Sequence, residues 1–106
     1  MIESERLVAD ALDALRVRWE YEPRLFALAT DGNGNCKHGF QPDFYLPEHD
    51  LYIEVTRAKE QYPKNRKLRL LQEQYPDVRC FLFGRKDFER PRERLLEILT
   101  WPAYEC

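Results

Sequence analysis

Residues 40–56, with the sequence FQPDFYLPEHDLYIEVT, decide the fold, because two apolar runs are joined there by a short polar segment. The segment 47–50 reads as a turn, so the two runs can pair as neighbouring strands. Successive side chains of a strand point to opposite faces, so Glu54 shares a face with Tyr52 and Thr56. Asp43, from the first run, can therefore converge with Glu54 on one face of the sheet.

These two acids are the first candidates for chemistry. A carboxylate in an otherwise apolar strand is costly unless it is paired or bound to a cation. Two carboxylates close together repel each other unless a proton or a metal ion lies between them. An all-oxygen pair suits Mg²⁺ or Mn²⁺, which polarises a phosphodiester and lowers the pKa of an attacking water. For Asp43 or Glu54 alone, an edge-strand acid facing solvent is an equally good interpretation.

The sequence before this stretch predicts a helix and two strands. Ser4 is expected to be the N-cap of a helix that runs to about Val17, with apolar residues at helical spacing. Alternating apolar residues over 18–28 predict the first strand, and 39–46 predicts the second. The turn signal at 31–35 lies between them, so the two strands are expected to form a hairpin.

The sequence after the third strand, 51–56, predicts a crossover. Pro63 fits the first turn of a helix that runs to about Tyr75, and 78–83 is a short apolar run typical of a fourth strand. A strand, a crossover helix and a second strand require the third and fourth strands to be parallel neighbours or near neighbours.

The C-terminal part predicts a last helix. Asp87 or Glu89 is expected to cap it, and Pro91 lies near its start. The side chains expected to pack inward are those of Leu95, Leu96, Ile98 and Leu99. The full order predicts a single α/β domain over residues 1–106, in which helices flank a mixed four-stranded sheet.

Basic residues gather in one segment of a chain whose net charge is −2. From residue 57 to residue 69 they outnumber a single acid; they are Arg57, Lys59, Lys64, Arg66, Lys67 and Arg69. A basic patch on an acidic body is typical of a protein that meets phosphates at one surface. Arg57, Arg66 and Arg69 are interpreted as backbone-phosphate contacts, and Arg85 and Lys86 extend the positive rim. For the charge run alone, a solvated helix face is the simpler interpretation.

Several classes of protein are disfavoured. No apolar run is long enough to cross a bilayer, and the acidic N-terminus lacks the apolar core of a signal peptide, so a cytoplasmic protein is expected. Three widely spaced cysteines argue against a disulfide framework. Cys36, His38 and His49 lack the paired spacing of a zinc site, and Cys80 is expected in the core.

The motifs at 40–47 and 52–55 closely resemble the signature of the PD-(D/E)XK nuclease superfamily, with Asp43 and Glu54 at its acidic positions. Residues 4–8 are similar to the first helix of its resolvase-like members. The resemblance spans residues 5–83 and implies an αβββαβ core. It also implies that Asp43, Glu54 and the backbone carbonyl of Val55 bind Mg²⁺ or Mn²⁺, with Glu5 completing or supporting the site.

One position departs from the family pattern. The lysine expected two residues after Glu54 is Thr56, whose hydroxyl cannot supply positive charge to the reaction. In some members of the superfamily the lysine lies on the next helix. On the helix predicted to follow Pro63, Lys64 continues the row of apolar side chains expected to face the sheet, and Lys67 lies at the edge of that row. These two lysines are better candidates than Lys59 to replace the missing lysine. Alternatively, these lysines bind phosphates or solvent.

The sequence therefore favours a metal-dependent endonuclease that hydrolyses phosphodiester bonds in DNA, in a resolvase-like or repair-like role. A nucleic-acid-binding module that lost cleavage with its lysine is the second interpretation. A subunit of a larger DNA-processing complex is the third. The apolar segment 99–104 either covers the edge of the core or forms a homodimer contact.

Overall fold

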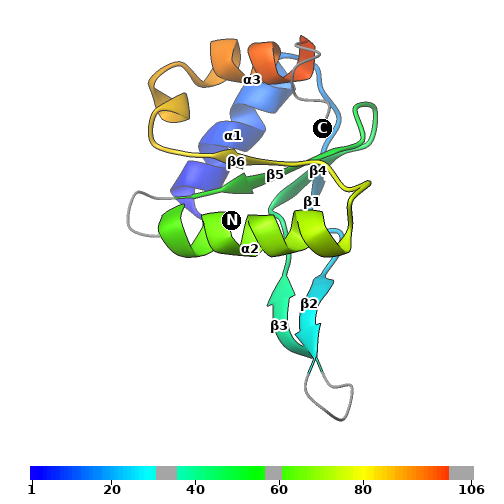
Figure 1. The fold of residues 1–106 in the computed structure, drawn as a ribbon. Helices are drawn as coiled ribbons and strands as arrows, with labels where there is room; N and C mark the ends of the chain where they lie inside the picture. The colour runs from blue at the N-terminus through cyan, green and yellow to red at the C-terminus, as the bar shows by residue number, and fades with distance from the viewer. Residues whose placement is uncertain (31–35, 57–60, 101–106) are drawn as a thin grey trace.

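A central sheet organises the computed structural model, which describes residues 1–30, 36–56 and 61–100 (Figure 1). In chain order the elements are α1 (Glu3–Ala14), β1 (Glu20–Tyr21), β2 (Phe26–Thr30), β3 (Cys36–Phe40), β4 (Phe44–Leu46), β5 (Leu51–Val55), α2 (Gln61–Gln74), β6 (Cys80–Phe83), the 3₁₀ helix η2 (Asp87–Glu89) and α3 (Pro91–Thr100). The sheet has the strand order β1-β4-β5-β6. Only β5 and β6 are parallel, so the predicted mixed four-stranded sheet is confirmed.

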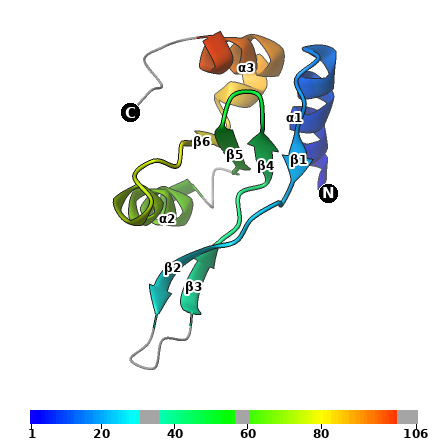
Figure 2. The same cartoon turned by 90° about the vertical axis from the view of Figure 1, so that its right-hand side faces the viewer.

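Helices cover both faces of this sheet (Figure 2). On one face Ile53 and Val55 pack with residues of α1 and α3, including Leu12 and Leu95. On the other face Tyr52 packs with Leu71 of α2 and with the β2–β3 hairpin. Every residue of β5 is buried, which explains why this strand is rich in apolar residues and why its single acid needs partners.

The first two predicted strands are each broken in two, which the alternating pattern did not indicate. The inner parts, β1 and β4, belong to the central sheet, while β2 and β3 form a separate two-stranded sheet that projects from the body (Figure 2). Pro23 and Pro42 lie in the two breaks, where a missing N–H interrupts strand pairing. The predicted hairpin does form, since Phe26 pairs with Phe40, but its turn at 31–35 lies outside the described residues.

The first helix differs from its prediction at both ends. Ser4 lies within α1, whose N-cap position is Ile2 and carries no side-chain cap, so the Ser4 prediction is wrong. The helix ends at Ala14 rather than near Val17, because Arg16 adopts a positive φ of 59° that no right-handed helix contains.

The elements around the crossover also differ by a few residues. The helix α2 begins at Gln61, two residues before Pro63, and ends one residue before Tyr75. The fourth strand begins at Cys80 rather than at Val78. Cys80 itself is buried beside Leu71, as expected for a core residue.

The C-terminal helix packs through Leu95 and Ile98, which are buried, and Leu99, which is partly buried. The prediction for Leu96 is wrong, because its side chain is 51% exposed. The helical advance of about 100° per residue turns Leu96 away from the direction that Leu95 faces. Instead of capping α3 directly, Asp87 begins the preceding η2 helix.

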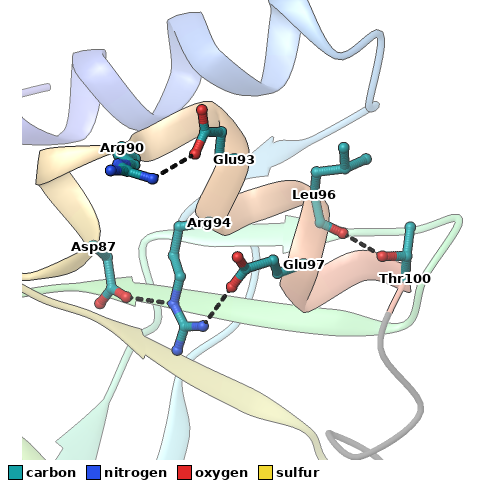
Figure 3. Close-up of polar contacts among 7 residues, drawn as sticks. All are labelled: Asp87, Arg90, Glu93, Arg94, Leu96, Glu97 and Thr100. Carbon is teal, nitrogen blue, oxygen red and sulfur yellow. Dashed lines mark hydrogen bonds and ion pairs between the residues drawn. The ribbon is translucent and has the colours of Figure 1, made fainter.

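A network around Asp87 holds α3 against the end of β6 (Figure 3). One carboxylate oxygen of Asp87 accepts the Gly84 N–H at 2.7 Å, and the other accepts Arg94 Nε at 2.6 Å. Arg94 also donates to Glu97 at 3.0 Å. By contrast, the neighbouring Arg90–Glu93 pair is largely exposed.

We expect Asp87→Ala to lower the free energy of unfolding by about 2 kcal/mol, because it removes two acceptors and leaves a partly buried guanidinium with fewer partners. Urea denaturation followed by circular dichroism measures the loss. Glu93→Ala is the matched control, and its exposed pair should change stability by no more than about 0.5 kcal/mol. Equal losses in the two variants would contradict the role given to Asp87.

Candidate active site

Asp43 and Glu54 lie together on the face of the sheet that α2 covers. Asp43 immediately precedes β4 and Glu54 belongs to β5; the two residues are 8% and 7% exposed. One carboxylate oxygen of Asp43 accepts the Val55 N–H at 2.8 Å. One carboxylate oxygen of Glu54 accepts the Asp43 N–H at 3.1 Å. Each acid therefore fixes the backbone of the other strand, and the two side chains are held in a defined position.

The pKa of the Asp43 carboxyl is raised to about 8, and burial is the largest cause. A hydrogen bond to Glu54 and the negative charge of Glu54 contribute to the same rise, whereas the Val55 N–H opposes it. The charge of Glu5 adds a smaller increase. In the absence of a cation the pair therefore holds a proton at neutral pH, as expected for two carboxylates that share one site.

This raised pKa predicts that the metal-free protein loses stability as the pH rises. Asp43 keeps its proton up to about pH 8 in the folded chain, but releases it near its ordinary pKa of 3.8 when unfolded. Between these values the folded state binds more protons, so the free energy of unfolding falls with increasing pH. Melting temperatures measured in EDTA from pH 5 to pH 9 should fall less steeply for Asp43→Asn. Parallel curves for the two proteins would contradict the assignment.

Lys64, from the first half of α2, supplies a positive charge to this pair. Its Nζ donates to the Val55 carbonyl at 2.7 Å and lies 3.3 Å from a carboxylate oxygen of Glu54. Its side chain is 24% exposed, so the ammonium group still has access to water. Of the three lysines that the sequence offered, the structure brings Lys64 to the acids. Lys67 is exposed, and Lys59 lies outside the described residues.

Thr56 occupies the position where the resemblance leads one to expect a lysine, and this position is closed to solvent. The residue is 2% exposed, and its N–H donates to the Phe83 carbonyl at 3.0 Å. A lysine side chain there would start from a closed site, where burial of an ammonium group is costly. Lys64 approaches the same acids from the helix and keeps partial contact with solvent.

Glu5 lies near the acids, on the first turn of α1, but it has its own partner. One of its carboxylate oxygens accepts the Tyr21 hydroxyl at 2.6 Å. This hydrogen bond is the main cause of a raised pKa of Tyr21. Tyr21 was not among the residues predicted for the site. The pairing of β1 with β4 brings Tyr21 close to the site, because Tyr21 lies opposite Phe44, the residue after Asp43.

The donor set suits a hard divalent cation. Two carboxylates and the Val55 carbonyl are the oxygen ligands that Mg²⁺ and Mn²⁺ prefer, and Mg²⁺ commonly binds through one or two carboxylates while keeping several waters. Within the described ranges, no group of three or more His, Cys, Asp or Glu side chains is placed to hold a metal ion. The fit therefore rests on Asp43, Glu54 and Val55, whose carbonyl oxygen has two lone pairs and accepts Lys64 Nζ with one of them.

The exposed side of α2 carries the basic residues expected to contact phosphates. Arg66, Lys67 and Arg69 are all exposed, on the same helix that turns Lys64 toward the sheet. Arg57, like Lys59, lies outside the described residues. One helix thus presents positive charge both to the buried acids and to the surface.

Comparisons of the chain with protein-family models, with curated proteins and with solved structures give no match. None of the helices that the structure describes is both long and apolar enough to cross a membrane.

Proposed function

We propose that the chain is a Mg²⁺- or Mn²⁺-dependent endonuclease of the PD-(D/E)XK type that hydrolyses phosphodiester bonds in DNA. The observation that carries the proposal is the buried Asp43–Glu54 pair, with the Lys64 ammonium 3.3 Å from Glu54. Besides its metal ion, a nuclease of this type needs two acids and one positively charged side chain. Here that side chain would be Lys64 of α2 instead of a lysine at position 56. The resemblance of residues 40–47 and 52–55 to the family signature supports the same proposal.

Asp43, Glu54 and the Val55 carbonyl would hold the metal ion. When bound, this ion would polarise the phosphodiester and lower the pKa of the attacking water. Lys64 would provide a fixed positive charge beside the reacting group, where negative charge develops. Glu5, held by Tyr21, would support the site from α1.

Arg66, Lys67 and Arg69 would bind phosphates of the DNA backbone on either side of the cleaved bond. Such contacts do not recognise the base sequence. This is consistent with a substrate recognised by its shape, as in resolvase-like or repair-like enzymes. Arg57 and Lys59 are proposed for the same surface. We further propose that the protein acts in the cytoplasm, alone, as a homodimer or within a larger DNA-processing complex.

A nucleic-acid-binding module without cleavage is the second candidate function. The observation in its favour is that Lys64 already contacts Glu54 and the Val55 carbonyl, two of the groups proposed to bind metal. A chain that keeps this lysine in place would hold the acids together without a metal. Its basic helix would still bind DNA phosphates, with an affinity that falls steeply as salt is added.

One assay separates the two functions. Purified protein is incubated with supercoiled plasmid and with branched DNA, in Mg²⁺, Mn²⁺ or EDTA, while calorimetry measures metal uptake. Nicking in Mg²⁺ or Mn²⁺, with none in EDTA, supports the nuclease. DNA binding without nicking in either metal would show the binding module instead.

A further inference from the structure

Among the residues that the structure describes, β6 forms an edge of the central sheet that lacks the usual protection. Edge strands are commonly blocked by charge, by proline, by a bulge or by shortness, because their free backbone groups invite another strand. At the opposite edge, β1 has two residues, and one of them, Glu20, is charged and exposed. In contrast, β6 has four residues with the sequence CFLF and pairs with β5 without a register shift.

The hydrogen bonds to β5 define which groups of β6 point outward. Tyr52 N–H donates to the Arg79 carbonyl at 2.8 Å, which sets the phase of the parallel ladder. In such a ladder alternate residues bond to one neighbour, so the amides of Phe81 and Phe83 face β5. The N–H and C=O groups of Cys80 and Leu82 therefore face the open side.

Two cavities lie along this open edge and share Phe81. The first, about 580 Å³, is lined by Phe81, Leu82 and Arg94, among others. The second, about 350 Å³, is lined by Phe81, Val78 and Ile98, among others. Figure 1 looks onto the edge and shows β6 between α3 above and α2 below. Because the two cavities share Phe81, they are together called the β6 groove. Its lining is apolar at Phe81, Val78 and Ile98 and charged at Arg79, Arg85 and Lys86.

Basic side chains lie at both ends of the groove. Arg85 and Lys86 line the first cavity; Arg94 also lines it, but its charge is paired with Asp87 and Glu97. Arg79 lines the second, and its Nε is buried without a hydrogen-bond partner within the part of the chain that the structure describes. A buried donor of this kind normally has an acceptor. The groove is therefore complementary to an acidic partner.

We propose that the open edge of β6 binds an extended acidic segment of a partner protein, which pairs with Cys80 and Leu82 as an added fifth strand. Pairing of this type takes its affinity from main-chain hydrogen bonds and its selectivity from alternate side chains. Apolar side chains of the segment would enter the groove, and its acids would meet Arg85, Lys86 and Arg79. This proposal does not depend on the proposed nuclease function, because it uses the edge of β6 and not the Asp43–Glu54 pair.

The charges disfavour a second copy of the chain as the occupant. Antiparallel pairing of two β6 strands would bring Arg79 of each copy close to the segment 84–86 of the other copy, so that like charges meet. Nucleic acid would satisfy the charges but lacks the alternating amide donors and carbonyl acceptors that complete a sheet edge. An acidic peptide satisfies both requirements.

The test measures the binding of a fluorescein-labelled peptide of alternating glutamate and valine by fluorescence anisotropy. The double variant R85E/K86E should weaken binding by at least about tenfold, because it reverses charge at one end of the groove. The matched control is R16E/R18E, which makes the same change at exposed positions near β1 and should bind as the unaltered protein does. A peptide N-methylated at alternate residues should bind at least about tenfold more weakly, because it loses main-chain donors.

Amide hydrogen exchange measured by NMR locates the bound peptide. The peptide should slow exchange at Cys80 and Leu82 and leave Phe81 and Phe83 unchanged, since these two already bond to β5. Equal binding of a lysine–valine peptide, no binding at millimolar peptide, or protection on α2 instead of β6 would overturn the proposal. So would dimerisation through this edge in light scattering, or binding that requires removal of residues 101–106.

Discussion

Asp43→Asn is expected to abolish metal-dependent nicking, with a loss of roughly 10³-fold or more, while the protein stays folded. Asparagine has the shape of aspartate, and its amide oxygen can still accept the Val55 N–H that now donates to Asp43 at 2.8 Å. It cannot supply the negative charge that a divalent cation requires. Initial rates of plasmid relaxation in Mg²⁺, together with calorimetric metal uptake, measure the effect.

Asp10→Asn is the matched control for this prediction, because Asp10 is exposed on α1 and far from both acids in the sequence. It should cleave and bind metal as the unaltered protein does. Cleavage by Asp43→Asn at a similar rate would show that the nicking has another origin, and the metal site proposed here would then be wrong.

Lys64→Ala is expected to slow cleavage by roughly 10²-fold, because it removes the positive charge beside Glu54. Lys67→Ala should change the rate by only a few fold, since its exposed side chain contributes to phosphate binding alone. Single-turnover rates at saturating DNA separate this catalytic effect from an effect on affinity.

Metal uptake distinguishes Lys64 from the metal ligands. Lys64 contacts Glu54 and the Val55 carbonyl, so its removal should leave Mg²⁺ binding intact or make it tighter, whereas Asp43→Asn loses it. If Lys64→Ala cleaved normally and Lys67→Ala did not, the roles of the two lysines would be reversed. If neither variant changed the rate, no lysine of α2 would take part.

The sheet could be predicted because its pattern is local. Burial of both faces makes β5 apolar throughout, and the crossover through α2 makes β5 and β6 parallel. The breaks between β1 and β2 and between β3 and β4 could not be placed. The apolar alternation continues across Pro23 and Pro42, and the exit of the chain from the sheet depends on which strand it pairs with.

The meeting of the two acids follows from strand alternation and a short turn, and Lys64 follows from the phase of its helix. Tyr21 could not be found in this way. Its contact with Glu5 joins α1 to β1, and it depends on the pairing of Tyr21 with Phe44, which no local pattern specifies. The inward prediction for Leu96 failed for a related reason, since a run of apolar residues in a short helix does not reveal which one faces its neighbour.

The projecting hairpin meets the sheet at the residues that hold Asp43. Glu22 N–H donates to the Asp43 carbonyl at 2.9 Å, and the Gln41 side-chain amide donates to the Glu22 carbonyl at 3.1 Å. Both strands of the hairpin therefore connect to the body through the same short backbone junction. A ligand that displaces the hairpin is therefore expected to shift the backbone of Asp43, and with it the carboxylate that accepts the Val55 N–H.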